Sequence, residues 1–170
     1  MSRKAGHVEV RAADVDDVRG IQDVARTTWD HTYNESIPAN VRAEFVSQAY
    51  SSDSLRRRKE SNVFLVAAEG GEILGFADFR PLSETEAELS AIYVLPEMQE
   101  RGIGTRLLEA GIGAFLPRTS FVLRVERDNA QAQRFYEAHG FRRAGQHTDA
   151  FYGHVVNEVE MILETHSGKC

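Results

Sequence analysis

The stretch that decides the fold reads Ile92-Tyr93-Val94-Leu95-Pro96-Glu97-Met98-Gln99-Glu100-Arg101-Gly102-Ile103-Gly104-Thr105-Arg106-Leu107-Leu108. Its first residues are apolar and extended in pattern, as in a strand, and Pro96 ends that strand. Gly102 and Gly104 then precede a run with the apolar spacing of a helix. Glycines in such a turn let backbone N–H groups approach a ligand, and the helix N-terminus favours an anion. The stretch predicts a diphosphate-binding turn, with a loop that only needs flexibility as the alternative.

Other catalytic and phosphate motifs are absent from the sequence. A dinucleotide fingerprint needs a third glycine where Leu107 stands, and neither a Walker Gly-Lys-Ser/Thr nor a Gly-x-Ser-x-Gly elbow occurs. The six histidines show no metal-ligand spacing, so we expect no metal site. The single cysteine, Cys170, predicts neither an internal disulfide nor a cysteine nucleophile.

Length and composition indicate an ordinary globular protein. The 170 residues predict a single domain over 1–170, and 42% are hydrophobic and 27% charged. The net charge of −6 argues against nucleic acid and anionic membranes as partners. Apolar runs are far shorter than the about 20 residues of a membrane span, and no signal-peptide core follows Met1. We therefore expect a cytoplasmic protein.

Strand and helix patterns alternate on both sides of the decisive stretch. Helical patterns begin near Asp14 and Pro38, and three others cover residues 55–59, 102–115 and 130–139. Strand patterns cover residues 8–10, 63–68, 73–79, 87–95, 121–125, 141–144 and 155–163. This order predicts an α/β fold with a mixed, mostly antiparallel sheet of about seven strands flanked by about four to five helices. Residues 87–125 should form a parallel crossover.

Three local expectations follow from the patterning. Val15 should lie on the buried face of the first helix, with Ile21 and Trp29 farther along that face. The basic run of residues 56–59 should be a solvated face, since the rest of the chain is acidic. Residues 145–154 should form a loop before the last strand.

Two motifs carry a family resemblance. Gln99-Glu100-Arg101-Gly102-Ile103-Gly104 resembles the acetyl-coenzyme-A signature of the GNAT superfamily of N-acetyltransferases, Gln/Arg-x-x-Gly-x-Gly/Ala. The segment at residues 129–141 is similar to a second hallmark, Asn-x-x-Ala-x-x-Phe-Tyr-x-x-x-Gly-Phe. The resemblance covers residues 60–163 and implies the GNAT fold, acetyl-coenzyme A (acetyl-CoA) as co-substrate, and N-acetyltransferase activity.

The resemblance also assigns residues to acetyl-CoA. Backbone groups of Ile92 and Val94 would pair with the pantetheine arm, and amides of the glycine turn would hold the pyrophosphate. Asn129 would contact the pantetheine, and Tyr136 would approach the thioester sulfur. The expected cofactor-binding residues are Ile92, Tyr93, Val94, Gln99, Glu100, Arg101, Gly102, Ile103, Gly104, Thr105, Asn129 and Tyr136.

Attack of an amine on a thioester requires a base, an oxyanion donor and an acid. Glu88 is the first candidate for the base because it shares strand parity with Val94, while Glu86 and Glu126 compete with it. The Val94 amide would stabilise the oxyanion, and Tyr136 would protonate the leaving thiolate. A solvated strand-end glutamate and a core aromatic are the alternative interpretations of Glu88 and Tyr136.

The acceptor side is suggested by weaker patterns. Residues 28–33 and 149–153 lie in the segments that usually wall the acceptor site in this family. Residues 28–33 are similar to a Thr-aromatic-x-x-Thr-aromatic segment of bacterial spermine/spermidine acetyltransferases, and residues 145–147, an aromatic–glycine pair and residues 158–161 resemble their tail. These segments predict four acceptor-binding residues, although Trp29 could equally anchor the core: Trp29, Asp30, Tyr33 and Tyr152.

The favoured function is transfer of an acetyl group to a small primary amine or polyamine by direct attack in a ternary complex. One alternative is a catalytically silent acyl-CoA-binding module on the same fold. Another is a protein N-terminal acetyltransferase, disfavoured because Arg124 stands where such relatives often carry a glutamate. From the habit of the family we expect a homodimer.

Overall fold

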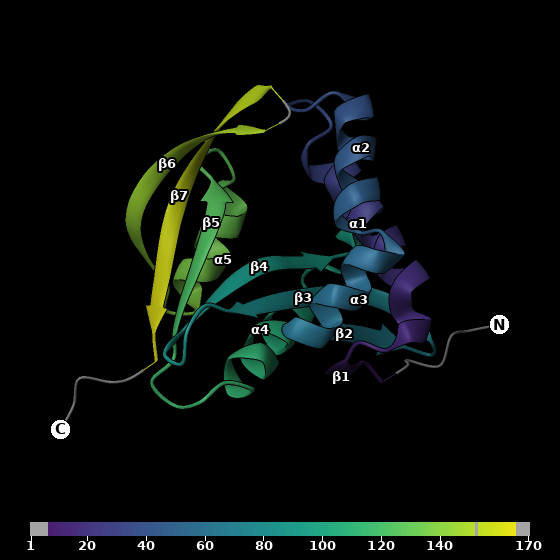
Figure 1. Cartoon of the computed structure of the whole chain (residues 1–170), viewed down its shortest axis with the longest axis horizontal. Coiled ribbons are helices and arrows are strands. Elements are labelled where there is room, and N and C mark those ends of the chain that lie inside the picture. The colour runs from purple at the N-terminus through teal and green to yellow at the C-terminus, as the bar shows by residue number, and fades with distance from the viewer. Residues whose placement is uncertain (1–6, 152, 166–170) are drawn as a thin grey trace. The chain divides into compact units, whose positions relative to one another are not determined.

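Seven strands and five α-helices make up the part of the chain described by the computed structural model, residues 7–151 and 153–165 (Figure 1). The strands are β1 (Glu9–Ala12), β2 (Val63–Glu69), β3 (Glu72–Pro81), β4 (Glu86–Val94), β5 (Ser120–Glu126), β6 (Arg142–Phe151) and β7 (His154–Glu164). The helices are α1 (Val18–Thr32), α2 (Ala39–Ala49), α3 (Ser52–Ser61), α4 (Ile103–Gly113) and α5 (Ala130–Ala138). Two 3₁₀ turns, η1 (Val15–Asp17) and η2 (Pro96–Met98), precede α1 and follow β4.

The sheet has the strand order β1-β2-β3-β4-β5-β7-β6. Strand pairs β1/β2, β2/β3, β5/β7 and β6/β7 are antiparallel. Strand β4 pairs with β5 in parallel, from Glu86 opposite Ser120 to Glu88 opposite Val122. The predicted α/β class, mixed sheet and parallel β4/β5 pair are confirmed.

The chain divides into two compact units, each with its own buried side chains. The first unit comprises the residues up to Phe79 together with Ala91–Ala114, and Phe76, Leu74 and Leu107 are fully buried there. The second unit comprises Arg80–Ser90 and the residues from Phe115 onward, with Phe121, Leu123 and Met161 at its centre. The expectation of a single domain over 1–170 stays a prediction.

Alternating residues of β3 face different helices in the first unit. Phe76 packs on Tyr50, which follows α2, and Asp78 binds Arg58 of α3. Phe79 has the opposite parity and meets α4 at Gly111, where an added Cβ would lie 1.9 Å from the Phe79 ring. Glycine at this position therefore lets α4 approach β3 closely.

The expectation that Val15 lies on a buried helix face is wrong. Val15 is in η1 and 67% exposed, whereas Ile21, Val24 and Trp29 are buried on α1. The Asp14 backbone N–H donates to the Asp17 carboxylate at 2.7 Å, and this local bond accompanies a tighter turn. Because a 3₁₀ turn has three residues per turn, the helical period does not extend back to Val15.

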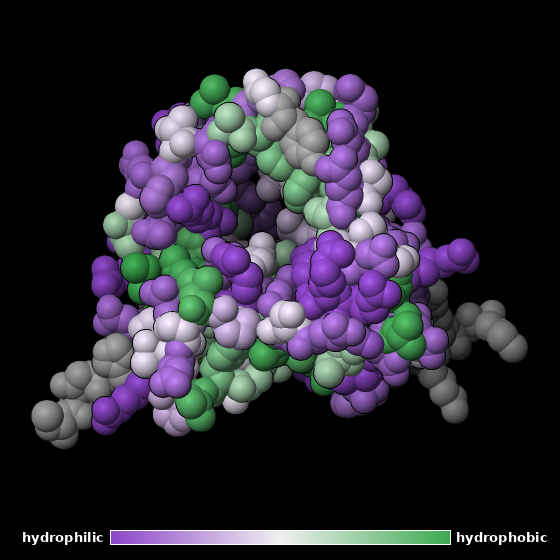
Figure 2. All heavy atoms as spheres, in the orientation of Figure 1, coloured by the Kyte–Doolittle hydropathy of each residue, from purple (hydrophilic) through white to green (hydrophobic). Residues whose placement is uncertain are grey.

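The basic run of residues 56–59 is solvated with one exception. Arg56, Arg57 and Lys59 are exposed, and hydrophilic side chains cover the region of α3 in Figure 2. Arg58, by contrast, is only 21% exposed and pairs with the buried Asp78. It lies three residues after the buried Leu55, so helical spacing places it on the inner side of α3.

The expected loop at residues 145–154 is instead the greater part of β6 and the start of β7. Strand β6 extends to Phe151, and the pairing of β6 with β7 ends at Phe151 opposite His154. A register shift between Arg143 and Gly145 interrupts the two-residue alternation. Because β6 is also the edge strand and mostly polar, its sequence lacks a clear strand pattern.

Candidate functional site

The end of β4 is held by backbone and side-chain bonds. The Leu95 N–H donates to the Leu74 carbonyl at 2.9 Å, which anchors the residue after β4 to β3. The Gln99 side-chain amide donates to the Val94 carbonyl at 3.3 Å. The first residue of the glycine signature therefore folds back on the strand whose backbone is predicted to pair with pantetheine.

The glycine turn opens directly into α4. Gly102 is the N-cap residue of α4 with φ +77°, a left-handed conformation that favours glycine, and an added Cβ would meet nothing within 4 Å. Ile103, Gly104 and Thr105 form the first helical turn, whose N–H groups lack helical acceptors. Open space beside Gly102 and these donors fit an anionic diphosphate.

Arg101 ties the turn to the β2–β3 hairpin. Its guanidinium donates to the Glu69 carboxylate at 2.9 Å and to the Met98 sulfur at 3.0 Å. Arg101 is thus the residue of the signature that joins the turn to Glu69. The spacing of residues in the sequence did not indicate Glu69 as its partner.

In the second unit, the other hallmark begins at an N-cap. The Asn129 side-chain oxygen accepts from the Ala132 N–H at 3.1 Å and so caps α5. Gln133, only 4% exposed, donates to the carbonyls of Glu126 and Arg127 at 3.0 and 2.8 Å. Gln133 fixes α5 to the end of β5, a role that sequence reasoning missed.

Tyr136 is half-buried on α5. Its ring lies 5.4 Å from that of Phe135 and 5.7 Å from that of Phe141. The Phe141 N–H donates to the Tyr136 carbonyl at 3.1 Å, where the chain leaves the helix through Gly140. Packing and backbone bonds thus fix the position of the tyrosine predicted to act as an acid.

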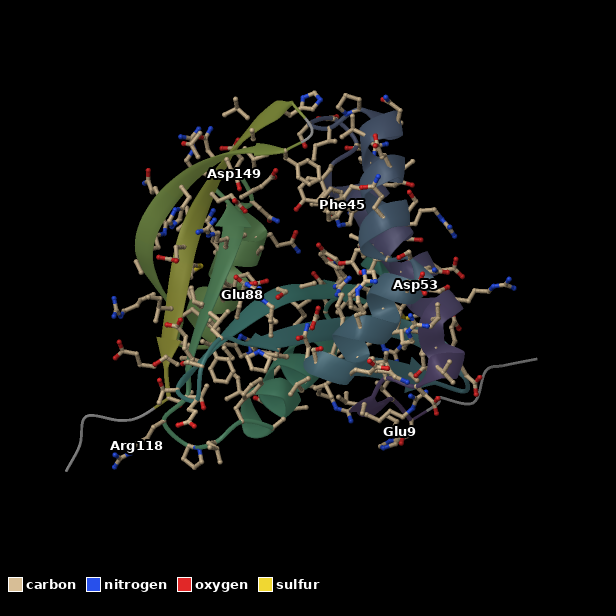
Figure 3. All side chains as sticks on the ribbon, in the orientation of Figure 1. Glu9, Phe45, Asp53, Glu88, Arg118 and Asp149 are labelled. Atoms are coloured by element: carbon tan, nitrogen blue, oxygen red, sulfur yellow. The ribbon has the colours of Figure 1, made fainter. Side chains whose placement is uncertain are left out.

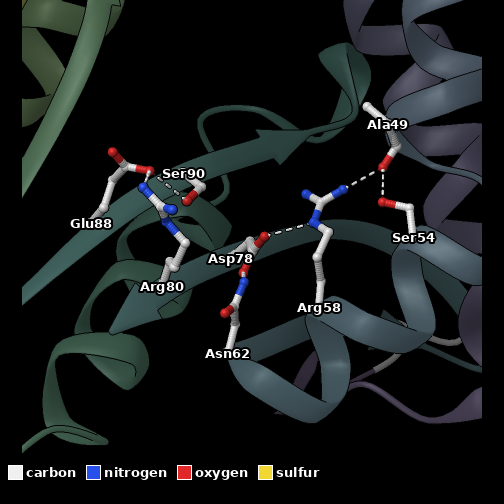
Figure 4. A network of polar contacts seen from close by, with 8 residues as sticks. All are labelled: Ala49, Ser54, Arg58, Asn62, Asp78, Arg80, Glu88 and Ser90. Atoms are coloured by element: carbon white, nitrogen blue, oxygen red, sulfur yellow. Dashed lines mark hydrogen bonds and ion pairs between the residues drawn. The ribbon is translucent and has the colours of Figure 1, made fainter. Parts of the chain in front are cut away.

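Glu88 lies on β4 in the second unit (Figure 3). One carboxylate oxygen accepts from Arg80 at 3.2 Å and from the Ser90 hydroxyl at 3.0 Å (Figure 4). The predicted base is therefore already engaged by a cation and a hydroxyl.

A second pair of carboxylates lies on the same unit. Glu126 of β5 and Glu158 of β7 stand directly opposite each other in the antiparallel register. Burial first, and then the neighbouring Asp128 and Glu158, raise the pKa of Glu126 above its ordinary value. Burial also raises the pKa of Glu158, with Asp149 adding to the effect and Arg124 and His147 opposing it.

Strand parity places further charges on the face of this carboxylate pair. Arg124 is opposite Glu160, and His147 on β6 is opposite Glu158. Asp149 also lies on β6 (Figure 3). It is two residues from His147 and therefore has the same strand parity. The alternation of β7 could have indicated the position of Glu158. Because β6 was not predicted as a strand, the sequence did not place His147 and Asp149 on the same face.

The residues predicted for the acceptor differ in exposure. Trp29 is 8% exposed and packs on Tyr33 and Phe45 at ring distances of 4.5 and 4.3 Å. Asp30 is exposed and pairs with Arg42 at 3.1 Å. Tyr152 lies outside the described residues. Trp29 is therefore a core residue, and its role toward an acceptor stays a prediction.

The two units divide the predicted site residues between them. The first holds residues 92–94, the glycine turn at residues 99–105, and Trp29, Asp30 and Tyr33. The second holds Glu88, Asn129 and Tyr136.

Comparison with solved structures shows the fold to which this chain belongs. The structure of the PaiA N-acetyltransferase from Thermoplasma acidophilum in complex with coenzyme A superposes with a TM-score of 0.80 and 23% sequence identity. The match covers 93% of this chain and 99% of that protein. The fold is therefore that of the GNAT N-acetyltransferases, as predicted.

Sequence comparison identifies the family. The model of the acetyltransferase (GNAT) family matches residues 22–141. The uncharacterized N-acetyltransferase YuaI of Bacillus subtilis is 32% identical over 89% of this chain and 90% of its own length. The chain belongs to the acetyltransferase (GNAT) family, and the predicted acyltransferase class is confirmed.

A relative of assigned activity is more distant. The spermidine N(1)-acetyltransferase of Thermoplasma acidophilum is 28% identical over 79% of this chain and 88% of its own length.

Within the described residues, none of the helices combines the length and the apolarity that crossing a membrane requires.

Proposed function

We propose that this protein transfers an acetyl group from acetyl-CoA to a small primary amine, with a polyamine as the favoured acceptor. The observation that carries the proposal is the pair of half-buried carboxylates Glu126 and Glu158, on a face that also bears Asp149 and Glu160. The similarity of this chain to a spermidine N(1)-acetyltransferase supports the same class of acceptor.

The residues toward acetyl-CoA are those of the glycine turn and the end of β4. The first N–H groups of α4, with Gly102 and Gly104, would bind the pyrophosphate. The backbone of Ile92 and Val94 would pair with the pantetheine arm as a neighbouring strand does. Acetyl-CoA supplies the activated acetyl group as a thioester.

Glu126 is the better candidate for the base. An alkylamine has a pKa of about 10, so the acceptor arrives as an ammonium ion. It must lose a proton before its nitrogen can attack. The raised pKa of Glu126 makes it a stronger proton acceptor than an ordinary carboxylate. Glu88 remains the alternative, although it already accepts bonds from Arg80 and Ser90.

The remaining steps need one donor and one acid. The amine nitrogen forms a bond to the carbonyl carbon, and the Val94 N–H would donate to the oxygen as it gains negative charge. The carbon–sulfur bond then breaks, and the Tyr136 hydroxyl would protonate the leaving thiolate. The attacking nitrogen loses its second proton to solvent, and Glu126 releases to solvent the proton that it took from the ammonium ion. The products are an N-acetylated amine and free coenzyme A, and Tyr136 regains its proton from solvent.

The test is steady-state release of free coenzyme A across four acceptors: spermidine, spermine, lysine and a peptide with a free N-terminus. We expect the highest kcat/KM for the polyamines, with activity rising from neutral pH toward about 9 as more of the amine is deprotonated. A kcat/KM for the peptide above that of spermidine would reject the polyamine acceptor. Absence of turnover with every amine would leave a silent acyl-CoA-binding module.

A further inference from the structure

We propose that Gln133 is a positioning residue that fixes Glu126 relative to α5, the helix that carries Tyr136. The inference rests on the proposed function, in which Glu126 takes a proton from the acceptor amine and Tyr136 gives one to the leaving thiolate. The residues involved all belong to the second unit. A base and an acid that act on one reacting complex must keep a constant separation. The hydrogen bonds of Gln133 join the two elements that bear them.

Both ends of the Gln133 side-chain amide have partners. Its nitrogen donates to the Glu126 carbonyl at 3.0 Å and to the Arg127 carbonyl at 2.8 Å. Its oxygen accepts from the Arg143 guanidinium of β6 at 2.8 Å. Because carbonyls only accept and a guanidinium only donates, these partners allow one orientation of the amide. The side chain is 4% exposed, so little water is at hand to replace a lost bond.

The bonds of Gln133 act on the peptide group that follows Glu126. That group consists of the Glu126 carbonyl and the Arg127 N–H. The carbonyl accepts from Gln133 and also from the Asn129 N–H, at 3.0 Å for each. The Arg127 N–H donates to the Asn157 carbonyl of β7 at 2.9 Å. A peptide group is planar and rigid, so bonds to both of its polar atoms fix the backbone angle ψ at Glu126. Glu126 therefore projects its carboxylate from a fixed backbone.

The same residue is part of the first turns of α5. The Gln133 backbone N–H donates to the carbonyl of the N-cap residue, Asn129, at 3.2 Å. Tyr136 follows three residues later, about one helical turn along α5. Since one turn of a hydrogen-bonded helix is rigid, fixing Gln133 to the end of β5 also fixes the position from which the Tyr136 side chain extends. Gln133 thus sets the separation of the proposed base and the proposed acid.

Packing alone does not require an amide at this position. An apolar side chain of similar length would fill the same volume, and its burial would not remove polar atoms from water. What the amide adds is direction, because its donors and its acceptor must each meet a partner. Gln133 therefore specifies how α5 is oriented on the end of β5, besides holding the two together.

The decisive variant is Gln133→Met, which keeps the length of the side chain and removes both donated bonds. Gln133→Glu is the second variant, because it keeps the shape and an acceptor for Arg143 while its carboxylate offers the two carbonyls no proton. Arg143→Met is the matched control. It breaks the bond at the other end of the amide, together with an exposed ion pair to Glu137, and leaves both bonds to the carbonyls. Glu126→Gln removes the proposed base.

Three measurements separate positioning from stability. The first is the single-turnover rate of acetyl transfer from about pH 6 to about pH 9, with the protein in excess over acetyl-CoA, so that product release does not limit the rate. The acceptor is whichever of spermidine, spermine, lysine and the peptide reacts fastest with the wild-type protein. The second is the Kd for acetyl-CoA by calorimetry, and the third is Tm.

We expect Gln133→Met and Gln133→Glu to lower the single-turnover rate at neutral pH about 10²-fold, the effect of displacing a reacting group by about 1 Å. The Kd for acetyl-CoA should change little. The loss should shrink toward about pH 9, where more of the amine is already deprotonated and the base matters less. In the Glu126→Gln background Gln133→Met should have little further effect, because both changes remove the same function. Arg143→Met should keep the wild-type rate.

Wild-type rates in both Gln133 variants, beside a slow Glu126→Gln, would overturn the positioning role even if Tm falls, and the proposed function would survive. A loss that is equal at every pH and undiminished in the Glu126→Gln background would also overturn it, since Gln133 would then act on stability alone. If Glu126→Gln itself keeps the wild-type rate, Glu126 is not the base and the inference falls with it. If the wild-type protein acetylates none of the four amines, the proposed function is wrong and so is the inference.

Discussion

At the scale of single residues, Tyr136 combines a fixed position with an ionisable hydroxyl. Its ring is held by Phe135 and Phe141, and the backbone of Phe141 is bonded to its carbonyl. Replacing the hydroxyl with hydrogen leaves these ring and backbone contacts in place. A loss of rate in such a variant therefore reports on chemistry rather than on folding.

We predict that Tyr136→Phe lowers kcat by about 10²- to 10⁴-fold, the usual range for loss of a general acid. The Kd for acetyl-CoA, measured by calorimetry, should change little. Phe135→Leu is the control for packing alone and should change Tm more than kcat. A wild-type kcat in Tyr136→Phe would mean that solvent protonates the thiolate.

The positions of residues in the fold were predictable where a family motif fixes them and not where folding brings distant residues together. Asn129 and Gly102 occupy the ends of helices that their motifs anticipate. Arg58 carries no local sign of burial, because its partner Asp78 is 20 residues away on another element. Glu126 and Glu158 likewise meet only through the register of β5 and β7.

At the scale of elements, the packing of α4 on β3 depends on one small residue. A Cβ on Gly111 would lie 1.9 Å from the Phe79 ring, whereas a Cβ on Gly113 would meet nothing within 4 Å. The same replacement at two positions of one helix therefore separates packing from helix propensity.

Gly111→Ala should destabilise the protein by about 1–3 kcal/mol, because the ring of Phe79 must move in a packed core. Gly113→Ala should be neutral or stabilise it by up to about 1 kcal/mol, since alanine favours helix. Urea denaturation of both variants measures the difference. Equal stabilities would show that α4 is free to shift away from β3.

The Glu126–Glu158 pair also belongs to this scale, because two strands bring like charges together. The folded-state pKa of each is raised, so the folded protein holds these protons more tightly than the unfolded chain. Their contribution to stability is therefore fully present below about pH 4 and is lost as pH rises through the folded pKa values.

Glu158→Gln should accordingly raise the free energy of unfolding at about pH 7.5, on the order of 0.5 kcal/mol because both carboxylates are partly solvated. The gain should vanish near about pH 4, where both groups are protonated. Glu160→Gln is the control with the opposite sign, since Glu160 stands opposite Arg124. Chemical denaturation at the two pH values measures both. A gain for Glu158→Gln that does not depend on pH would refute the repulsion.

Elements with a regular period were predictable, whereas elements with an irregularity were not. The hairpin of β2 and β3 and the helices α4 and α5 follow their sequence patterns. Strand β6 was not predicted from the sequence, because a bulge and its position at the exposed edge of the sheet obscure the alternation of polar and apolar residues. Turn η1 was not predicted from the sequence. There the Asp17 carboxylate accepts hydrogen bonds from the Asp14 backbone and from Arg11, and the helix begins only after this turn.

At the scale of the whole molecule, the net charge of −6 acts on any charged acceptor before contact. A polyamine carries several positive charges, so its encounter with this protein should be accelerated at low ionic strength. We predict that kcat/KM for spermidine falls more steeply than that for a monoamine between about 0.05 and 0.5 M salt. Equal salt slopes for the two amines in steady-state kinetics would contradict electrostatic attraction of the acceptor.

The fold class was predictable because two motifs and the order of elements agree over most of the chain. The acceptor was not, since the charged face proposed to bind it is assembled from several strands. Residues such as Glu158 and Asp149 lie on different elements, and only the paired register of β6 and β7 gives them a common face.

The Arg58–Asp78 ion pair constrains how this protein can evolve. Loss of Arg58 leaves the buried charge of Asp78 without its cation, at a cost of about 3–5 kcal/mol, while replacing both residues with apolar ones can be neutral. An evolutionary route that replaces Arg58 first therefore passes through a strongly destabilised protein. In descendants of this sequence, the arginine and the aspartate should be inherited together or lost together.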